Sequence, residues 1–423
     1  MWTMLRTNRD IRALFVAQVV SFMGDWFAYV AFVGLVQDVT DAPILVTLVY
    51  VAQALPAFLM SPVAGPVADR FDRKRVIRTV SLVQTVAAAG LLLVGSAGSL
   101  WFGFLCLCAI SALGSFVGPA SQAGLPNLAR TPDELTKAAL LFGSLWGAML
   151  AVGAALGGLV ASVFGRDVAF VANAASFVLA AGSVSLIRRP MQAPRDADDG
   201  APRPRMRPLA DMHEAFSYAR KDSVLLSLLA SKATFAMGAG IVGLLAVLAT
   251  EELGGGDAAT GLLVAARGVG VALGPLIAAR LVGPSLARVL LMCGGAGMSF
   301  GVFYLGLSGA PFLALAALFG FLAHLGGGAQ WTLSTYGLQR RAPDHIRGRI
   351  LAGDFGIVTL IITLSNLAAG ALAGAVGARG AIAVFSLLAI AASATYFVLT
   401  RPVRAALARE ESGLEPLSAS PAT

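Results

Sequence analysis

A series of long apolar segments constrains this chain more than any other feature. An α-helix needs about 20 mainly apolar residues to cross roughly 30 Å of hydrocarbon. Segments of that length occur near residues 13-36, 44-66, 76-96, 100-124, 135-161, 167-187, 223-250, 259-280, 286-308, 311-337, 349-375 and 380-400. The chain is 57% apolar and 13% charged, whereas soluble proteins carry about 25% charged residues. The sequence therefore predicts an all-α polytopic membrane protein with twelve transmembrane helices.

The basic residues predict how these segments are oriented. Of the 31 Lys and Arg residues, 27 lie in the amino-terminal arm, the tail and every second connection, and the opposite face holds only Arg166 and Arg379. Lys and Arg concentrate in cytoplasmic loops, so both chain ends are expected on the cytoplasmic side of the cell membrane. This topology accounts for the net charge of +8, and no nucleic-acid partner is expected.

The segments fall into two groups of six. We expect an N-terminal six-helix bundle over 1-187 and a C-terminal six-helix bundle over 223-400. The connection 188-222 is rich in charge and proline, which disfavours a packed core, and it ends in a short amphipathic pattern typical of a surface helix. The polar tail 401-423 is expected to be disordered. Similar features recur about 210 residues apart, which is typical of a duplicated unit.

The connection after the second segment is short and strongly charged. Its residues are Gly65, Pro66, Val67, Ala68, Asp69, Arg70, Phe71, Asp72, Arg73, Lys74 and Arg75. Basic side chains cross a membrane at a high cost, so the loop is expected to stay cytoplasmic. It resembles the loop signature of the major facilitator superfamily, Gly-x-Leu-Ala-Asp-Arg-x-Gly-Arg-Lys, with Val67 in place of Leu and Asp72 in place of the second Gly. The resemblance implies the major facilitator fold of two six-helix bundles with a substrate site at the midplane.

The same resemblance implies a cytoplasmic gate, in which the loop acid meets the amino-terminal end of the eleventh helix. Carried over, the gate comprises Gly65, Asp69, Arg70, Arg73, Lys74, Arg349 and Asp354. For Asp354 we favour an ion pair with Arg347 and Arg349, or with the loop that contains Arg73. Separately, Thr131 to Glu134 has the pattern of a helix N-cap with proline in the first turn.

Ionisable side chains at membrane depth are costly and are therefore candidates for function. The candidates for proton coupling are Asp25, Lys232, Arg267 and His324. Asp25 is the preferred proton-binding residue, because burial disfavours its charged form. The alternative is a structural ion pair of Asp25 with Lys232 or Arg267. For His324 the alternative is an imidazole hydrogen-bonded between two helices.

Several aromatic residues are candidates for contact with an amphipathic ligand. They are Trp26, Phe27, Trp146, Phe235, Trp331 and Tyr336, and for each of them packing or lipid contact is the alternative. Glycines spaced by four residues, such as Gly153 with Gly157 and Gly270 with Gly274, are expected where helices approach closely.

Further motifs resemble the branch of the superfamily that contains bacterial siderophore exporters and macrolide efflux pumps. They are Gly24-Asp25-Trp26, Gln53-Ala54-Leu55-Pro56 and Ala266-Arg267-Gly268-Val269-Gly270. This resemblance implies a secondary active transporter that exports an amphipathic small molecule in exchange for protons by alternating access, working as a monomer. An importer of the same fold and a transport-inactive sensor or scaffold are the alternatives.

An enzyme is not expected, because the sequence has no paired acids, nucleophile elbow, phosphate-binding loop or His-rich cluster. The three cysteines, Cys106, Cys108 and Cys293, lie inside apolar segments without metal-binding spacing, and they are interpreted as packing residues. No metal and no cofactor are expected.

Overall fold

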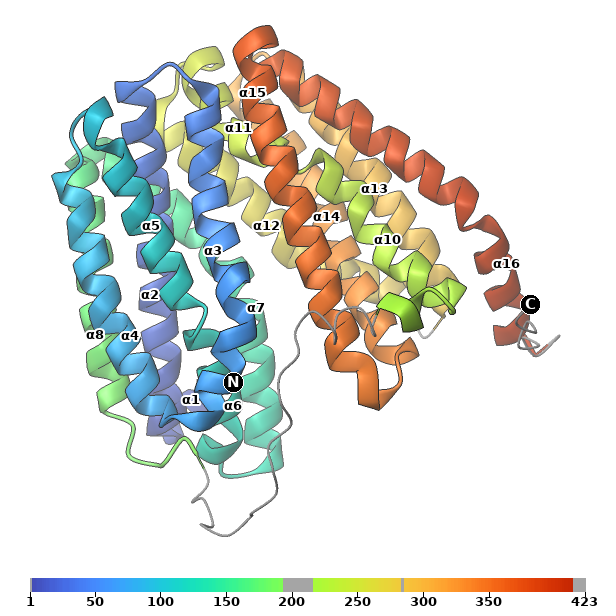
Figure 1. Cartoon of the computed structure of the whole chain (residues 1–423), viewed down its shortest axis with the longest axis horizontal. Coiled ribbons are helices and arrows are strands. Elements are labelled where there is room, and N and C mark those ends of the chain that lie inside the picture. Colours follow the sequence, from blue (N-terminus) through green and yellow to red (C-terminus); the bar gives the residue numbers. More distant parts are fainter. Residues whose placement is uncertain (1, 193–215, 283–284, 414–423) are drawn as a thin grey trace. The chain divides into compact units, whose positions relative to one another are not determined.

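The structure is a computed structural model that describes residues 2–192, 216–282 and 285–413. Throughout these ranges the regular elements are helices (Figure 1). They include eleven helices or helix runs that are long and apolar enough to cross a membrane. The predicted all-α membrane fold is confirmed.

The longest candidate span accounts for the difference between eleven and twelve crossings. It runs from Gly353 to Leu399, and 47 helical residues would extend about 70 Å, more than twice the thickness of the hydrocarbon layer. The run is broken at Gly377, whose φ of 74° lies in the left-handed region that favours glycine. The run therefore comprises two crossings, and the predicted twelve agree with the structure.

The chain divides into two compact units, residues 1–206 with 243–268 and residues 207–242 with 269–423. The unit boundaries thus differ from the bundles expected from sequence, because the segment 243–268 groups with the first unit. The first unit contains α1 (Trp2–Thr7), α2 (Arg9–Val39), α3 (Pro43–Arg70), α4 (Arg73–Gly90), the short 3-10 turns η1 (Leu91–Leu93) and η2 (Ala97–Ser99), α5 (Leu100–Gly114), α6 (Val117–Leu128), α7 (Pro132–Phe164) and α8 (Arg166–Ser185).

The segment that joins the first unit from the second half of the sequence includes most of α11 (Ile241–Val247), the π-helical turn η3 (Leu248–Glu252) and the first part of α12 (Gly256–Val282). The second unit contains α10 (Ser223–Gly238), the remainder of α12, α13 (Leu286–Ser308), α14 (Leu313–Arg341), α15 (Asp344–Leu399) and α16 (Arg401–Glu411).

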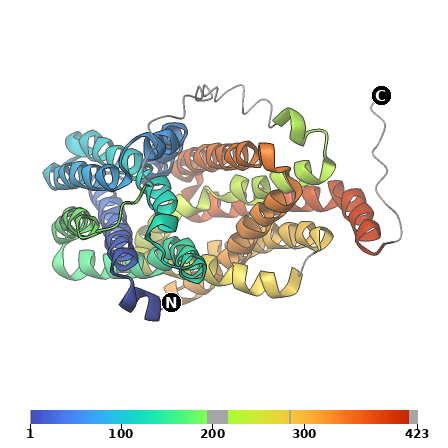
Figure 2. The same ribbon diagram turned by 90° about the horizontal axis from the view of Figure 1, so that it is seen from below.

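Within the first unit, α2 packs against α7 and α8, and α4 packs against α5 and α8 (Figures 1 and 2). Two local signals start these helices. The Asn8 side chain caps α2 by accepting hydrogen bonds from the backbone of Asp10 and Ile11, and Thr131 caps α7 by accepting one from the backbone of Glu134. The predicted N-cap at Thr131 is confirmed.

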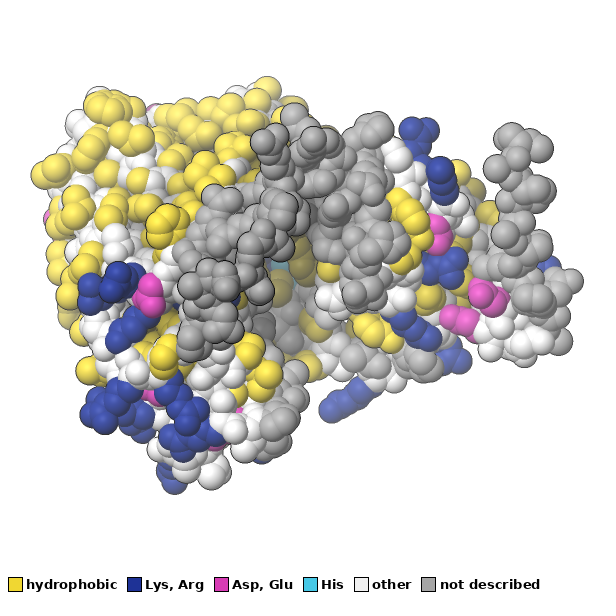
Figure 3. Space-filling view, turned by 60° about the horizontal axis from the view of Figure 1, so that its bottom comes forward, with side chains coloured by type: hydrophobic (Ala, Val, Ile, Leu, Met, Phe, Trp, Pro, Cys, Tyr) yellow, Lys and Arg dark blue, Asp and Glu magenta, His cyan; other side chains and the backbone are white. Residues whose placement is uncertain are grey.

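Polar and apolar side chains separate along the first unit. Lys and Arg side chains gather on the end that faces the viewer in Figure 3, whereas apolar side chains cover its flank. Exposed basic residues of this end come from α1 and from the starts of α2 and α4, for example Arg6, Arg9 and Arg75. This separation is what a bilayer requires of a membrane-spanning bundle.

In the second unit, α13 packs against α14 and α15, and α10 packs against α15. This unit also bears on two predictions, one for the tail after residue 400 and one for the linker before residue 222. The expectation of a disordered tail is wrong for its first part, because Arg401–Glu411 form α16, whose Leu407 is buried in the core with an exposed fraction of 2%. The predicted surface helix before residue 222 lies mainly outside the described residues, and only 216–219 are seen to be helical.

The glycine pairs lie where helices approach closely. A Cβ atom at Gly157 would lie 2.9 Å from the Cα of Phe27 in α2, and one at Gly274 would lie 2.1 Å from the carbonyl oxygen of Leu325 in α14. Neither position has room for a larger side chain, so the predicted packing role is confirmed.

Candidate functional site

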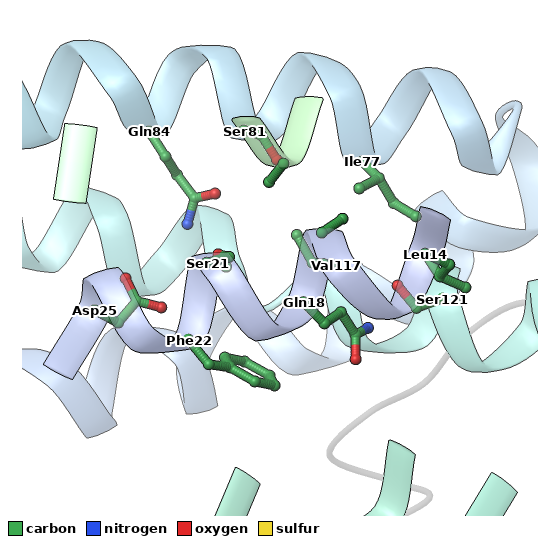
Figure 4. A pocket seen from close by; sticks show the side chains of 13 residues that line it. Leu14, Gln18, Ser21, Phe22, Asp25, Ile77, Ser81, Gln84, Val117 and Ser121 are labelled. Atoms are coloured by element: carbon green, nitrogen blue, oxygen red, sulfur yellow. The ribbon is translucent and has the colours of Figure 1, made fainter. Parts of the chain in front are cut away.

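Asp25 lies midway along α2 and points into the interior of the first unit (Figure 4). Its Oδ1 atom is buried and accepts no hydrogen bond from the part of the chain that the structure describes. Among the described residues of the first unit, no basic side chain forms an ion pair with the Asp25 carboxylate. A buried carboxylate without a hydrogen-bond partner lowers the stability of the fold, so Asp25 is a candidate for a functional role rather than a structural one.

The Asp25 carboxylate faces a small cavity lined by both polar and apolar side chains, which we call the α2 cavity (Figure 4). Its volume is about 40 Å³, whereas one water molecule needs roughly 10–15 Å³ measured in this way. The cavity therefore has room for a few water molecules. Its lining comes from α2, α4, α5, α6 and α8 and consists of Leu14, Ala17, Gln18, Ser21, Phe22, Asp25, Ile77, Ser81, Gln84, Gly114, Val117, Ser121 and Ala180.

Further polar side chains line the α2 cavity on the side away from Asp25. Gln18, Ser21 and Asp25 are spaced three and four residues apart, which places them on one face of α2. From α4, the Gln84 amide group donates a 2.9 Å hydrogen bond to the carbonyl oxygen of Ile110, which fixes the orientation of this side chain beside the cavity. At the other end of the cavity, the Ser121 hydroxyl is fully buried and has no partner among the described residues. These groups can hydrogen-bond water along the cavity.

Arg267 in α12 lies beside aromatic rings of the first unit. Its guanidinium carbon is 5.9 Å from the centre of the Tyr50 ring in α3, and it is close enough to Tyr29 to interact electrostatically. Tyr29 in turn contacts Trp26, with ring centres 5.4 Å apart, and Trp26 lies 6.5 Å from Trp146. Two of the expected ligand-contacting residues, Trp26 and Trp146, are therefore neighbours. Phe27 lies one residue further along α2, beside Gly157 of α7.

Lys232 and Asp354 form a buried ion pair in the second unit, between α10 and α15. The ammonium group also donates a 2.8 Å hydrogen bond to Thr335 Oγ1 and lies 4.7 Å from the centre of the Trp331 ring. The sequence prediction that Asp354 pairs with the nearby arginines or with the loop at Arg73 is corrected by this contact. The pairing follows from the packing of α10 against α15, which brings together residues 122 positions apart.

Aromatic rings continue from this ion pair through the second unit. Trp331 lies 6.3 Å from Phe355 and 6.4 Å from Phe235 between ring centres, and Phe235 lies 5.4 Å from Phe300. Phe235 and Trp331 are partly buried, whereas Tyr336, the residue after Thr335 in α14, is 40% exposed. Of the three ligand candidates in this unit, two are thus in contact.

His324 has the surroundings of a structural imidazole. It is 2% exposed, and its Nδ1 lies 3.1 Å from the hydroxyl oxygen of Tyr304 in α13 and 3.2 Å from the carbonyl oxygen of Gly320 in its own helix. The rings of Phe300 and Tyr304 each lie 5.5 Å from the imidazole. This geometry favours the alternative of a histidine hydrogen-bonded between helices.

The loop expected to form the gate is only partly described. Arg73 donates to the carbonyl oxygens of Ala68, Ala123 and Met191 at 2.7–3.2 Å. Lys74 donates to that of Ile187 at 2.6 Å. The side chains of Asp69, Arg70 and Arg349, and the surroundings of Gly65, lie outside the described part of the structure. Arg73 and Lys74 thus connect the loop to the end of α3, to α6 and to the segment that follows α8.

One charged cluster was not expected from the sequence. Arg166, at the start of α8, donates a 2.8 Å hydrogen bond to Asp257 and is also ion-paired with Asp38 at the end of α2. The sequence could have predicted an ion pair here, because Arg166 lies on the face expected to carry mainly acidic residues. The polar residues Gln84 and Ser121 were also missed, although an amide inside an apolar segment is itself a signal of a polar contact.

Comparisons with known proteins agree with this architecture. Residues 2–419 match the major facilitator family described as "Transmembrane secretion effector". Two uncharacterized MFS-type transporters of Bacillus subtilis, YfiS and YkuC, are 26% and 27% identical over 229 residues. These alignments cover 53% and 52% of this chain and 52% of each relative, so the chain spans about half the length of the curated relatives it matches.

Solved structures share the fold at low sequence identity. A POT family transporter in complex with 5-aminolevulinic acid has a TM-score of 0.74 at 11% identity, covering 94% of this chain and 97% of that one. A bacterial homolog of the human lysosomal transporter Spinster has a TM-score of 0.70 at 15% identity, covering 93% and 97%. Since the family match extends over nearly the whole sequence, this chain belongs to the transmembrane secretion effector family of the major facilitator superfamily.

Proposed function

We propose that this transporter exports an amphipathic small molecule in exchange for protons, and that Asp25 is the residue that binds the proton. The observation that carries the proposal is the buried Asp25 Oδ1 atom, which has no partner among the described residues and faces the α2 cavity. The acid is neither neutralised by an ion pair within its unit nor enclosed in a dry core. Such a carboxylate can change its protonation state when its surroundings change.

The other ionisable candidates are less suited to this role. Lys232 and Asp354 neutralise each other, and His324 is enclosed by aromatic rings and hydrogen-bonded. Arg267 lies against the Tyr50 ring, with its guanidinium carbon 5.9 Å from the ring centre. We therefore assign Lys232, Asp354 and His324 to the support of the second unit. We assign Arg267 to the electrostatics of the aromatic region around Trp26.

The aromatic residues support an amphipathic cargo. In one unit Trp146, which is 49% exposed, offers apolar surface beside the buried Trp26. In the other unit the partly buried Phe235 and Trp331 do so beside the ammonium group of Lys232. Such surfaces suit a ligand with an apolar body and a polar or anionic group. Drugs, macrolides and siderophores have this character. The description of the matching family as secretion effectors supports the outward direction.

Transport in liposomes tests the coupling. Purified protein is reconstituted, and movement of ethidium or radiolabelled erythromycin is followed under an imposed pH gradient of either sign. Asp25→Asn is expected to abolish the flux driven by the pH gradient while leaving ligand binding intact, because the amide cannot take up the proton. Asp25→Glu is expected to retain part of the flux. Asp41→Asn, an exposed acid just after α2, is the matched control and is expected to be unaffected.

Two outcomes count against the proposal. If Asp25→Asn transports with the same pH dependence as the wild type, the proton is bound elsewhere. If uptake into right-side-out vesicles follows the gradient with cargo and protons moving in the same direction, the protein is an importer. Partner binding without any flux is the outcome expected of a transport-inactive sensor or scaffold.

We further propose that the loop at 65–75 is the cytoplasmic gate, with Asp69 as its acid and Arg73 as the residue that holds the loop in place. Arg73 supports this role through its bonds to the carbonyl oxygens of Ala123 and Met191. Asp69→Asn is expected to increase the labelling rate of a cysteine introduced at Tyr336, and Asp72→Asn, which can still cap α4, serves as the control. Equal labelling of the two variants would contradict the gate.

A further inference from the structure

A basic groove lies at one end of the second unit, between the start of α13 and α16. It is lined by Ala287, Arg288, Leu291, Arg401, Arg404, Ala405 and Ala408 and has a volume of about 470 Å³. This volume is within the roughly 300–1,000 Å³ of small-ligand sites. Three of the seven lining residues are arginines and none is an acid. We call this feature the α13–α16 groove.

The arginines of the α13–α16 groove lie at the depth where a membrane meets water. Arg288 is two residues inside α13, and Arg401 follows the last residue of the final span, Leu399, by two positions. With a rise of about 1.5 Å per residue, each lies only about 3 Å along the helix from the end of a span. This is the level of lipid headgroups rather than of acyl chains or of bulk water.

Arg404 is positioned by its own neighbours and has an unused donor. One of its terminal nitrogens donates a 2.7 Å hydrogen bond to the carbonyl oxygen of Phe397, and its guanidinium carbon lies 5.1 Å from the centre of the Phe397 ring. Its Nε atom is buried and has no acceptor among the described residues. The guanidinium group therefore has hydrogen-bonding capacity beyond its bond to Phe397, and its other terminal nitrogen can donate to an anionic oxygen in the groove.

The groove is held in shape without a ligand. Glu411, at the end of α16, accepts a 2.6 Å hydrogen bond from the backbone nitrogen of Leu286 and a second bond from the Ser285 hydroxyl. Leu407, three residues after Arg404 in α16, is buried in the core of the unit. Both contacts fix α16 beside α13, so the helix positions that carry the three arginines are held together before a ligand binds.

From this arrangement we propose that the α13–α16 groove binds the headgroup of an anionic phospholipid. The phosphate lies among Arg288, Arg401 and Arg404, since guanidinium groups bind phosphate oxygens in pairs. The acyl chains continue over Leu291, which lines the groove and is 48% exposed, and over Leu399, which is 70% exposed. This exposed apolar surface beside the arginines favours a lipid over a soluble phosphate. Basic pockets between transmembrane helices bind such lipids elsewhere.

Native mass spectrometry of the full-length protein in detergent tests the proposal. The protein is titrated with phosphatidylglycerol and, separately, with phosphatidylcholine of the same acyl chains. Wild type is expected to retain phosphatidylglycerol preferentially. The double variant Arg288→Gln/Arg401→Gln is expected to bind it about fivefold more weakly for each arginine removed, roughly 25-fold in total. Both residues are exposed, so their replacement leaves the core intact.

The controls separate the groove from a general effect of charge. Arg409→Gln removes an exposed arginine of α16 that does not line the groove, and it is expected to bind like wild type. Thermal unfolding of wild type in each lipid gives a second measurement, in which phosphatidylglycerol is expected to stabilise more than phosphatidylcholine. Equal retention of both lipids would overturn the proposal, as would equal loss in Arg409→Gln. Competition by glycerol phosphate at the same concentration would assign the groove to a soluble phosphate instead.

Discussion

The ammonium group of Lys232 in α10 is ion-paired with the Asp354 carboxylate in α15, and the side chains are 2% and 3% exposed. Each charge compensates the other in a region that water does not reach. Asp354 Oδ1 has no hydrogen-bond donor among the described residues, so Lys232 provides the main stabilisation that this carboxylate receives. The pair adds an electrostatic contact between two helices of the second unit that also pack against each other.

Removing one member of this pair is expected to be more harmful than removing both. Lys232→Met leaves a buried carboxylate uncompensated, at a cost of about 3–5 kcal/mol, whereas an apolar pair of similar size is often tolerated. The double variant Lys232→Met/Asp354→Leu is therefore expected to recover most of the stability lost in the single variant. Thermal unfolding of the purified proteins measures both. If the double variant is less stable than Lys232→Met, the pair does not act as a unit.

The Arg166 cluster is expected to restrain the start of α12. Arg166 bridges Asp257 of α12 and Asp38 of α2, so Arg166→Gln removes both ion pairs and leaves two acids close together. A cysteine at Ala154, buried in α7 beside Gly261 of α12, is expected to be labelled severalfold faster in this variant.

The background for that labelling experiment lacks Cys106, Cys108 and Cys293. Arg379→Gln is the matched control, because Arg379 is the other basic residue on the face expected to lie outside and bonds instead to the carbonyl oxygens of Ser308 and Ala310. Equal labelling in both variants would show that the cluster does not restrain α12.

Glu134 is expected to contribute to stability in a pH-dependent way. Burial opposes its charge, but hydrogen bonds from the Arg130 backbone and the Asn8 side chain, with the charges of Arg130 and Arg189, lower the pKa of Glu134 overall. Because the pKa is lower in the folded state, the contribution is present above the ordinary glutamate pKa, about 4.3, and is lost as the pH falls below it.

Glu134→Gln is therefore expected to lower the unfolding temperature at neutral pH and to have little effect in acid. Unfolding measured between pH 3 and 8 tests this expectation. The reverse pattern, with a larger effect in acid, would mean that the neutral form of Glu134 is the stabilising one.

Gly274 tests the close approach of α12 and α14. An alanine there would place its Cβ 2.1 Å from the carbonyl oxygen of Leu325, so Gly274→Ala is expected to separate the two helices and to destabilise the protein by about 1–3 kcal/mol. Gly182→Ala in α8 is the control, because nothing lies within 4 Å of its Cβ position. It is expected to be neutral or slightly stabilising. Comparable unfolding temperatures for the two variants would show that α12 and α14 tolerate a side chain at Gly274.

Hydropathy and local sequence motifs predicted those parts of the fold that depend on residues adjacent in the sequence. The apolar segments gave the crossings, and Thr131 gave the start of α7. The last two crossings were separated correctly although they meet at Gly377 without a longer loop. In each case a few adjacent residues determine the outcome, because the membrane imposes helix formation and length.

Contacts between distant residues could not be predicted in the same way. Asp354 has arginines close in sequence, but its partner is Lys232, and this choice depends on how α10 packs against α15. The α2 cavity likewise requires Gln84 and Ser121 to meet Asp25 from other helices. For α16, the four-residue spacing of Val403 and Leu407 was a local signal of a packed helix, but the charge of the segment obscured it.

The junction at Gly377 joins the last two crossings through a single residue in the left-handed region. Such a short connection has no slack, so one crossing cannot slide along the other without straining this residue. The first of the two carries Asp354, and the second leads directly into α16 and its arginines. The buried ion pair and the α13–α16 groove therefore belong to the two arms of a single helical hairpin that turns at one glycine.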